Sequence, residues 1–466
     1  MARRRSSSSS FSNLVLLALT LALFTGGLSW YRSSSNNLPA SLSRVEEAHE
    51  RIDALEEKVD ALMRAGKGQG SNAASEQPKI SEETSTDFGR VKRPKGVVTQ
   101  PGIHAIVTSN GNRYMNWQTR VSYNSYMRQS RAPGSQFKAF TRLLHRATDD
   151  ELMQEVPTVR IPSDHPDCDV WCSYPVADRG PALLRFLNMK IAWQYEHILV
   201  LETDHIFVAP LTIPLPQKGS GLAFPFGYIV PEWDSVKPIM RRYYSGPLKD
   251  IPGTGNSPVV LHVEDFARVV PLWVDTTEKI DADEEAVKVL GWVREMYAYS
   301  IASALANVTY SLPPVPKNPL MVQPPADEAL GEAVICHYTW GTFIHEGDKE
   351  LWRWDKREYA SGQYGDKPVV PMVKIPPMPE YSPAFMTQDK QKFSKGKYDL
   401  VKLMNRHFNM AVDALNAVNG GLPLGFETLE EATAASKPGQ EAIDAREKVV
   451  KAEEAKKAAE AAAKAS

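Results

Sequence analysis

Three titratable side chains follow an apolar run within four residues near the middle of the chain. Residues 198–201 are all apolar, and Glu202, Asp204 and His205 come directly after them. We expect a buried strand over residues 197–204, in which side chains two positions apart point to one side, so that Glu202 and Asp204 present two carboxylates together. Two such carboxylates repel each other unless a cation lies between them, and oxygen ligands suit Mg²⁺ or Mn²⁺. The spacing therefore predicts a divalent cation that also contacts substrate phosphates, as in an enzyme that uses a nucleoside diphosphate conjugate.

A second imidazole supports this prediction from a distant part of the chain. The apolar run "AVICHYTWG" (333–341) contains His337 near its end, and a neutral imidazole is a common metal ligand. We expect His337 to complete the site and rank His205 below it, because in a strand His205 points away from Asp204. The alternative is that the carboxylates only cap the strand and form salt bridges with neighbouring residues.

The segments around these residues alternate between strand-like and helix-like patterns. "GIHAIVTS" (102–109), "FKAFTRLLH" (137–145) and "PTVRIP" (157–162) have the composition of strands, and a helix is expected over residues 181–195. Such alternation is typical of an α/β domain with a largely parallel sheet, in which ligands bind beyond the carboxyl ends of the strands. We therefore expect the acidic pair at the ligand-binding edge of the sheet.

Distinctive sequence blocks recur in one order between about residue 102 and about residue 375. These are "HAIVTSNGNRYMNWQTRVSYNSY", "FTRLLH", "ETDHIFVAP", "FPFGYIVPE", "GNSPVVL", "GWVREMYAYSIAS", "MVQPP", "CHYTWG" and "WRWDKR". Together they resemble the hydroxyproline O-arabinosyltransferases of plants and green algae. The resemblance implies a GT-A-like (Rossmann-like) glycosyltransferase domain, UDP-β-L-arabinofuranose as donor, and a hydroxyproline-rich, extensin-like polypeptide as acceptor.

The resemblance also implies roles for the candidate ligands. The family's E-x-D-H block matches residues 202–205 and looks like the metal-binding D-x-D of GT-A enzymes. On that likeness Asp204 contacts Mn²⁺ (or Mg²⁺) directly, and Glu202 touches the metal shell or the ribose. His337 matches the metal-binding histidine near the end of many GT-A domains. Trp340 stands where relatives have Tyr, which keeps an aromatic side chain there.

Further polar residues are expected around the donor. The end of the first strand should meet the uridine, arginine and lysine side chains should offset the diphosphate charge, and small polar groups should lie against the donor sugar. For each basic residue the alternative is an ordinary surface salt bridge. The expected donor-binding residues are Thr108, Asn110, Arg179, Asn256, Ser257, Arg353 and Lys356, with Arg357 beside them.

A catalytic base is expected as well, because the resemblance implies inversion at the anomeric carbon by direct displacement. Glu295 is the candidate, since it lies in a strongly apolar helical segment, "GWVREMYAY", where an ionised carboxylate is costly unless it is used or paired. Burial would also raise the pKa of Glu295 toward the working range. The alternative is a buried carboxylate that bonds only to backbone. The rivals Asp281, Asp283 and Glu285 lie in a polar stretch that looks solvated.

Four tryptophans are candidates to line a groove for the acceptor. A hydroxyproline-rich peptide tends to form a polyproline II helix, and such helices dock on aromatic-lined grooves. The candidates are Trp117, Trp233, Trp292 and Trp340, although a tryptophan taken alone is more often part of the core.

Residues 1–100 are expected to tether this domain to a membrane. Residues 1–10 form a predicted cytoplasmic tail with three arginines, and residues 11–31 carry no charge over the length of a transmembrane helix. A cleaved signal peptide is the alternative. Residues 32–100 are expected to form a stalk that ends in a flexible linker over residues 66–100. Its residues 42–65 repeat apolar positions as in a short coiled coil, which could hold a homodimer or be a lone amphipathic helix.

The remaining boundaries follow composition. We expect the catalytic domain over residues 101–376, and over residues 377–436 an extension that packs on it, with a helix at 399–418. An Ala/Glu/Lys-rich solvated helix or disordered tail should occupy residues 437–466.

The resemblance implies a place in the Golgi membrane, with the cis-Golgi favoured, and the N-terminal pattern predicts a single-pass type II protein with a luminal catalytic domain. In that oxidising compartment Cys168 and Cys172 could pair, and Cys336 is left over in an apolar run. Asn307 begins a glycosylation sequon, Asn-Val-Thr. The net charge of −2 gives no general case for nucleic-acid binding.

Two rival functions remain open at this stage. A related domain occurs in peptidyl-serine galactosyltransferases, so the donor and acceptor could differ. A non-catalytic, membrane-tethered binder of proline-rich glycoproteins is a rival of another class, against which the set of Glu202, Asp204 and His337 argues.

Overall fold

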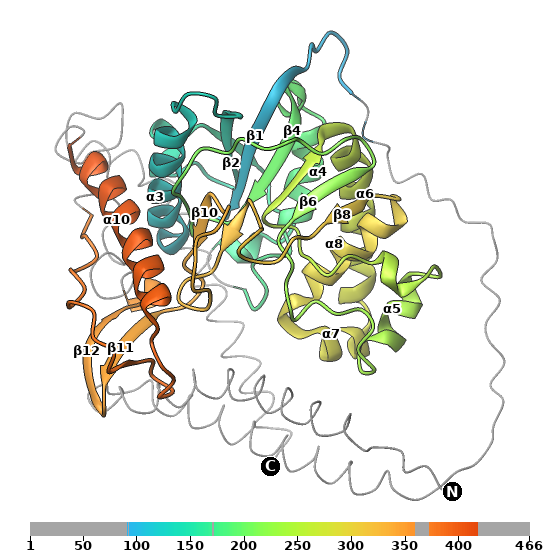
Figure 1. The fold of residues 1–466 in the computed structure, drawn as a ribbon. Coiled ribbons are helices and arrows are strands. Elements are labelled where there is room, and N and C mark those ends of the chain that lie inside the picture. Colours follow the sequence, from blue (N-terminus) through green and yellow to red (C-terminus); the bar gives the residue numbers. More distant parts are fainter. Residues whose placement is uncertain (1–90, 92, 170–171, 359–371, 418–466) are drawn as a thin grey trace, which may run out of the picture. The chain divides into compact units, whose positions relative to one another are not determined.

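The computed structural model describes residues 91, 93–169, 172–358 and 372–417 (Figure 1). The predicted cytoplasmic tail, membrane anchor and coiled coil, and the Ala/Glu/Lys-rich tail, lie outside the described residues. Within the ranges that are described, no helix combines the length and the apolar character needed to cross a bilayer.

A seven-stranded mixed sheet forms the centre of the fold, in the order β3-β2-β1-β4-β7-β6-β8. Strand β1 is parallel to both β2 and β4, and β2 is parallel to β3, as the alternating pattern predicts. Strand β7 instead runs antiparallel to both β4 and β6, so the sheet is less parallel than expected. The strands are β1 (Gln100–Ser109), β2 (Phe137–His145), β3 (Thr158–Ile161), β4 (Tyr195–Leu201), β6 (Ser220–Ala223), β7 (Val259–His262) and β8 (Thr309–Ser311).

Two small sheets accompany the central one. The first has the order β5-β10-β9 and the second the order β12-β11-β13. Their strands are β5 (His205–Phe207), β9 (Met321–Val322), β10 (Ile335–His337), β11 (Thr342–Glu346), β12 (Lys349–Trp354) and β13 (Phe385–Met386).

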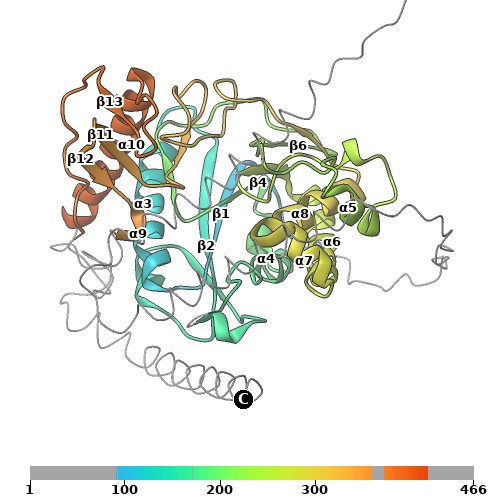
Figure 2. The same cartoon turned by 90° about the horizontal axis from the view of Figure 1, so that it is seen from below.

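Helices cover both faces of the central sheet, and Figure 2 shows α3 and α10 on one side and α4 to α8 on the other. The α-helices are α3 (Arg113–Ser130), α4 (Arg179–Leu187), α5 (Lys237–Tyr243), α6 (Val263–Asp281), α7 (Glu284–Leu290), α8 (Arg294–Leu305), α9 (Lys356–Glu358) and α10 (Lys395–Ala417). Short 3₁₀ turns lie at Glu151–Gln154, Pro166–Asp169, Lys190–Trp193, Leu248–Asp250 and Gly291–Val293.

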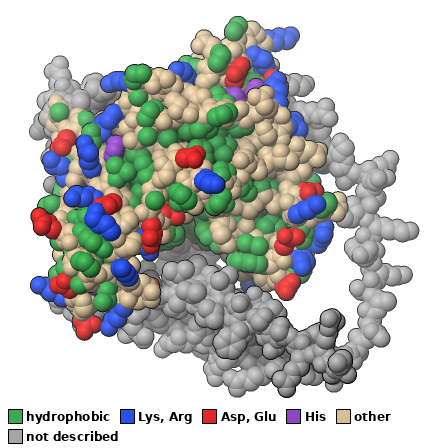
Figure 3. Space-filling view, viewed as in Figure 1, with side chains coloured by type: hydrophobic (Ala, Val, Ile, Leu, Met, Phe, Trp, Pro, Cys, Tyr) green, Lys and Arg blue, Asp and Glu red, His purple; other side chains and the backbone are tan. Residues whose placement is uncertain are grey.

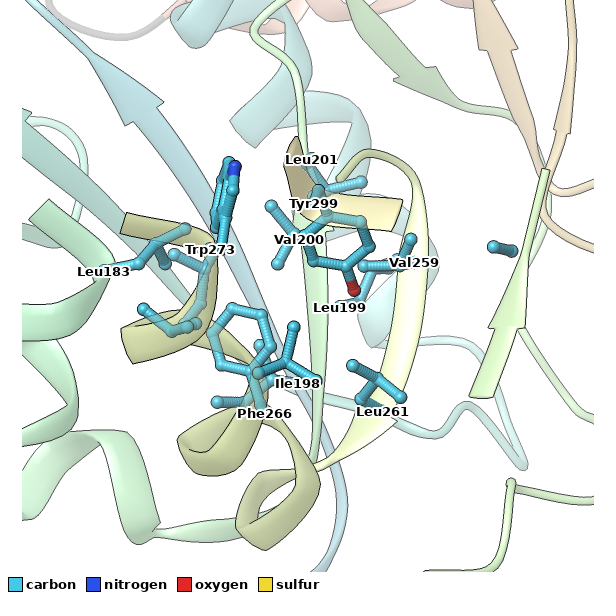
Figure 4. Close-up of a cluster of buried hydrophobic side chains, with 14 of the residues drawn as sticks. Leu183, Ile198, Leu199, Val200, Leu201, Val259, Leu261, Phe266, Trp273 and Tyr299 are labelled. Atoms are coloured by element: carbon cyan, nitrogen blue, oxygen red, sulfur yellow. The ribbon is translucent and has the colours of Figure 1, made fainter. Parts of the chain in front are cut away.

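The main core is built around β4, whose last four residues are apolar because the strand is buried on both faces. Figure 4 shows the side chains of residues 198–201 against Phe266 and Trp273 of α6, Leu183 of α4 and Tyr299 of α8. This packing holds the carboxyl end of β4, and with it the residues that follow, at a defined place in the fold.

A second core lies between α3, α10 and the hairpin β11–β12. Trp117 of α3 is fully buried, stacks on Tyr338 with ring centroids 6.1 Å apart, and meets Phe408 of α10. The prediction that Trp117 lines an acceptor groove is therefore wrong, because its ring is packed between α3 and α10 and is not accessible to a peptide. Trp233, Trp292 and Trp340 are exposed.

Two predicted elements end earlier than expected. The helix predicted over residues 181–195 stops at Leu187, where the Trp193 indole nitrogen donates to the Leu187 carbonyl and turns the chain back. The strand predicted over residues 197–204 stops at Leu201, and residues 202–204 form the turn that leads into β5.

On the face shown in Figure 3, charged side chains gather toward the two sides of the molecule. The middle of this face is mainly apolar and uncharged, apart from one acidic and one basic side chain that lie beside each other.

Candidate active site

The turn after β4 places Asp204 next to a histidine from a distant segment. Strand β5 pairs antiparallel with β10, and His205 lies opposite His337 in the register. The result is a distance of 3.1 Å between His337 Nε2 and Asp204 Oδ2. The sequence pattern suggests Asp204 and His337 as candidate ligands, and the pairing of β5 with β10 brings these two residues together.

Lys356 also reaches this carboxylate. Its Nζ atom contacts Asp204 Oδ2, and both side chains are buried. Burial disfavours the charged form of Asp204, but His337 and Lys356 outweigh it and hold the pKa of Asp204 well below its usual range. Asp204 is therefore an ionised carboxylate with one oxygen engaged, while its Oδ1 atom has no hydrogen-bond partner among the described residues.

His205 belongs to the same group, contrary to the expectation that it points away from Asp204. One ligand atom from each of Asp204, His205 and His337 can be chosen so that all three lie within 4.8 Å of one another. The expectation was wrong because the strand ends at Leu201, so the side-chain alternation of a strand does not apply to residues 202–204. Burial, followed by the neighbouring His337, lowers the pKa of His205 to about 3, which keeps its imidazole neutral.

Glu202 makes a different contact. Its Oε1 atom accepts a 2.8 Å hydrogen bond from Arg179 Nη1, and the same Arg179 nitrogen lies 3.8 Å from Glu295 Oε2. The cation between two carboxylates is thus a guanidinium, shared by Glu202 and Glu295. This matches the salt-bridge alternative for Glu202, and its predicted role at the metal shell or the ribose stays a prediction.

Glu295 lies in the first turn of α8 and is buried. Its Oε1 atom has no hydrogen-bond partner within the part of the chain that is described. Burial raises the pKa of Glu295 to about 7, and the positive charge of Arg179 limits the shift. A carboxyl group with this pKa is half ionised near neutral pH, as a general base requires.

The acidic rivals of Glu295 are all engaged in ion pairs. Asp281 pairs with Arg294, and Asp283 and Glu285 both pair with Arg242. Asp283 also caps α7 by accepting from two backbone N–H groups. These contacts account for the three carboxylates as structural groups.

The other predicted donor residues fall in two places. Thr108 and Asn110 are buried at the end of β1, where the Asn110 amide donates to the Cys168 carbonyl at 3.0 Å. Asn256 and Ser257 are buried in the loop before β7, and the Ser257 hydroxyl donates to the Val200 carbonyl at 3.4 Å.

Arg353 and Lys356, the two basic residues predicted to bind the donor after His337, point in different directions. Lys356 contacts Asp204, whereas Arg353 lies on the exposed side of β12 and its Nε atom is 3.6 Å from Glu350. Alternation along β12 separates them, since Trp352 and Trp354 point into the second core while Arg353 points out.

The structure also describes the three cysteines and the predicted glycosylation site. Cys168 and Cys172 form a disulfide just ahead of α4, and Cys336 is a buried free thiol. Asn307 is exposed directly after α8. Its use as a glycosylation site remains a prediction.

The residues around Asp204 fit a divalent cation. Asp204 Oδ1, His205 Nε2 and His337 Nδ1 are buried atoms that hydrogen-bond to nothing in the described ranges, and unmatched buried polar atoms are uncommon in folded proteins. A carboxylate oxygen with imidazole nitrogens is a donor set suited to a transition-metal ion such as Mn²⁺.

Comparison with known proteins gives one family. Residues 103–312 match the model of the hydroxyproline O-arabinosyltransferase family N-terminal domain. This span includes Arg179, Glu202, Asp204 and Glu295, whereas His337 and Lys356 lie beyond it.

Individual relatives extend the similarity. A hydroxyproline O-arabinosyltransferase of Pisum sativum is 35% identical over 291 residues, which is 60% of this chain and 84% of that protein. Another of Medicago truncatula is 36% identical over 57% of this chain and 74% of its own length. A peptidyl serine alpha-galactosyltransferase of Arabidopsis thaliana is more distant, at 27% identity over 46% of this chain and 27% of its length.

Proposed function

Because the chain belongs to the hydroxyproline O-arabinosyltransferase family, we propose that it transfers L-arabinofuranose from UDP-β-L-arabinofuranose to the hydroxyl of hydroxyproline. The acceptor in this proposal is a hydroxyproline-rich, extensin-like secreted polypeptide. The observation that carries the proposal is the 35% identity to the pea enzyme across 84% of that protein. The galactosyltransferase relative matches far less of its own length, so arabinose is the favoured sugar.

The fold supports a GT-A-like reading of the domain. The site lies at the carboxyl end of β4, next to β1, where the strand order reverses because β2 and β3 lie on one side of β1 and β4 on the other. In α/β proteins ligands bind outside the carboxyl ends of strands at such a reversal of strand order. Thr108 near the end of β1 and Asn110 directly after it lie at the same edge, which suits the proposed uridine site.

On the donor side, the site offers ligands for a cation and basic side chains that would offset the negative charge of a diphosphate. Asp204, His205 and His337 would hold Mn²⁺ or Mg²⁺, which when bound supplies positive charge against the departing UDP. Lys356 adds fixed positive charge at Asp204, and Arg179 adds it at Glu202. Asn256 and Ser257 would contact the sugar, and the Ser257 hydroxyl donates to the Val200 carbonyl near the end of β4.

On the acceptor side, Glu295 would take the proton from the hydroxyproline hydroxyl as the new bond forms. Its raised pKa allows it to be both ionised in part and able to hold a proton. Arg179 lies between Glu295 and Glu202 and fixes the distance between the base and the end of β4.

We further propose a Golgi location, with the cis-Golgi favoured, a type II anchor at residues 11–31 and a luminal catalytic domain. The Cys168–Cys172 disulfide supports an oxidising compartment. Dimerisation through residues 42–65 is part of the same proposal. Protease protection of the domain in sealed Golgi vesicles would test the orientation.

The direct test supplies the purified chain with UDP-arabinofuranose and a hydroxyproline peptide, and measures the product mass. We expect one added pentose, and none with a proline peptide or after EDTA treatment. UDP-galactose and a serine peptide form the matched control. A hexose added to serine, with no pentose on hydroxyproline, would reject the arabinosyltransferase proposal in favour of the galactosyl alternative.

A further inference from the structure

Lys356 contacts the carboxylate that would hold the proposed cation. Its ammonium group and the His337 imidazole both contact the same oxygen of Asp204, Oδ2. Lys356 is only 8% exposed, and Asp204 only 5%. The carboxylate therefore already has a positive partner in the chain itself.

Burial explains why such a partner is present. A buried carboxylate without compensation is very unfavourable, and removing one member of a buried ion pair is strongly destabilising. Lys356 is itself held in place, with its Nζ atom 5.9 Å from the centre of the Tyr338 ring.

A divalent ion at Asp204 would compete with the Lys356 ammonium for the negative charge of this carboxylate. A divalent ion held by Asp204 and His337 would sit beside the ammonium, and like charges at this separation in a buried site repel strongly. A nucleoside diphosphate changes the balance because its phosphate oxygens accept contacts from both cations. Lys356 can make the exchange by side-chain rotation alone, since its ammonium is carried on a flexible four-carbon stem.

We propose that Lys356 is a resident counter-ion for Asp204 that yields to the divalent cation only when a nucleoside diphosphate enters, so that metal and nucleotide bind as a unit. This inference rests on the proposed function, because it presupposes the metal site at Asp204. The inference predicts that the enzyme without nucleotide binds the divalent ion weakly, because the Lys356 ammonium competes with the ion for Asp204. Lys356 is thus a positioning residue that couples metal binding to donor binding.

The test measures Mn²⁺ binding to the full chain in detergent by electron paramagnetic resonance, first alone and then with UDP. We expect wild type to bind Mn²⁺ weakly alone and tightly with UDP. Lys356→Met should bind Mn²⁺ alone at least about tenfold more tightly than wild type, because the competing charge is gone. Lys356→Arg retains the competing charge and should, like wild type, bind Mn²⁺ weakly in the absence of UDP. Lys374→Met, which removes a half-exposed lysine paired with Asp413, is the matched control and should also behave as wild type.

Equal Mn²⁺ affinity of wild type and Lys356→Met in the absence of UDP would overturn the inference. If Lys356→Met is unstable, its thermal unfolding is followed with and without Mn²⁺. An ion that binds the folded state raises its unfolding temperature, so we expect Mn²⁺ to restore stability to this variant and to leave wild type unchanged. Instability that Mn²⁺ does not relieve would also overturn the inference.

Failure of the proposed function has a different signature. A chain that binds Mn²⁺ in the expected pattern but adds no pentose to hydroxyproline would reject the arabinosyltransferase activity and retain the counter-ion role. A chain that adds pentose after EDTA treatment and binds no Mn²⁺ even with UDP would reject the metal site, and the inference with it.

Discussion

The two halves of the site carry opposite charge arrangements. Around Asp204, one carboxylate is contacted by the Lys356 ammonium and the His337 imidazole, so basic groups outnumber acidic ones. Around Arg179, one guanidinium lies between Glu202 and Glu295, so carboxylates are in excess. The first arrangement suits an anionic diphosphate, and the second leaves one carboxylate with a raised pKa that can accept a proton. A glycosyl transfer needs both, one for the leaving group and one for the acceptor.

The largest expected effect on the transfer rate comes from a change in the half of the site around Asp204. Asp204→Asn removes the carboxylate that Lys356 and His337 contact, and transfer should fall by at least about a hundredfold. Asn keeps the size of the side chain, so the chain should still fold, but with lower stability because the buried Lys356 ammonium loses its charge partner. Activity and circular dichroism measured together separate loss of function from unfolding. Retained transfer would count against the metal role of Asp204.

Glu295→Gln should come next and tests the other half. Loss of a general base costs about 10²- to 10⁴-fold, whereas UDP and Mn²⁺ binding should be unchanged, since the variant leaves the Asp204 group untouched. Rates and calorimetric affinities check the two parts. Normal turnover would remove Glu295 as the base.

The stereochemistry of the product is a second test of Glu295 as the catalytic base. Direct displacement with Glu295 as base predicts inversion relative to the donor, which nuclear magnetic resonance of the first product can determine. Retention of the donor configuration would exclude this use of Glu295 while leaving the charge arrangement around Asp204 intact.

Arg179→Lys should have an intermediate effect. A lysine keeps the charge but lacks the planar guanidinium that lies between Glu202 and Glu295. Loss of a charge-assisted hydrogen bond costs about 1.5–3 kcal/mol, which corresponds to a drop of about ten- to a hundredfold in kcat/KM. Steady-state kinetics measure it. A change confined to KM for UDP-arabinofuranose would place Arg179 with the donor alone.

The smallest effect is the pH dependence. The pKa of Glu295 is raised to about 7, so its basic form is scarce at pH 6 and predominates at pH 8. We expect kcat/KM to rise about tenfold per pH unit below pH 7 and to level off above it. In Glu295→Gln this rise should disappear from the residual rate. A flat profile in wild type would show that no group with this pKa limits the reaction.

Much of this protein was predictable from local pattern. Apolar runs that end in polar residues predicted β1, β2 and β3, and the turn after β4 carries the acidic pair that marked the site. The helix expected over residues 399–418 is α10, Lys395–Ala417. The recurring blocks predicted the family, because several distinctive segments in one order are far more specific than any one motif.

Other features could not be obtained from spacing. The early end of β4 at Leu201 placed His205 beside Asp204 and not away from it. The depth of Trp117 in the second core depends on α10, a helix nearly three hundred residues later in the chain. The ion pair of Arg179 with Glu202 depends on how α4 packs against β4.

The sequence by itself determined which chemical groups this protein owns: the E-x-D-H block, His337, Lys356 and Glu295, and the α/β elements that carry them. Only the tertiary structure decided how they are paired, with Lys356 on Asp204, Arg179 between two glutamates and His205 among the ligands. The reason is physical. Side-chain periodicity is set within one element by its backbone geometry, whereas the partner of a buried charge is set by strand register and burial between elements far apart in the chain.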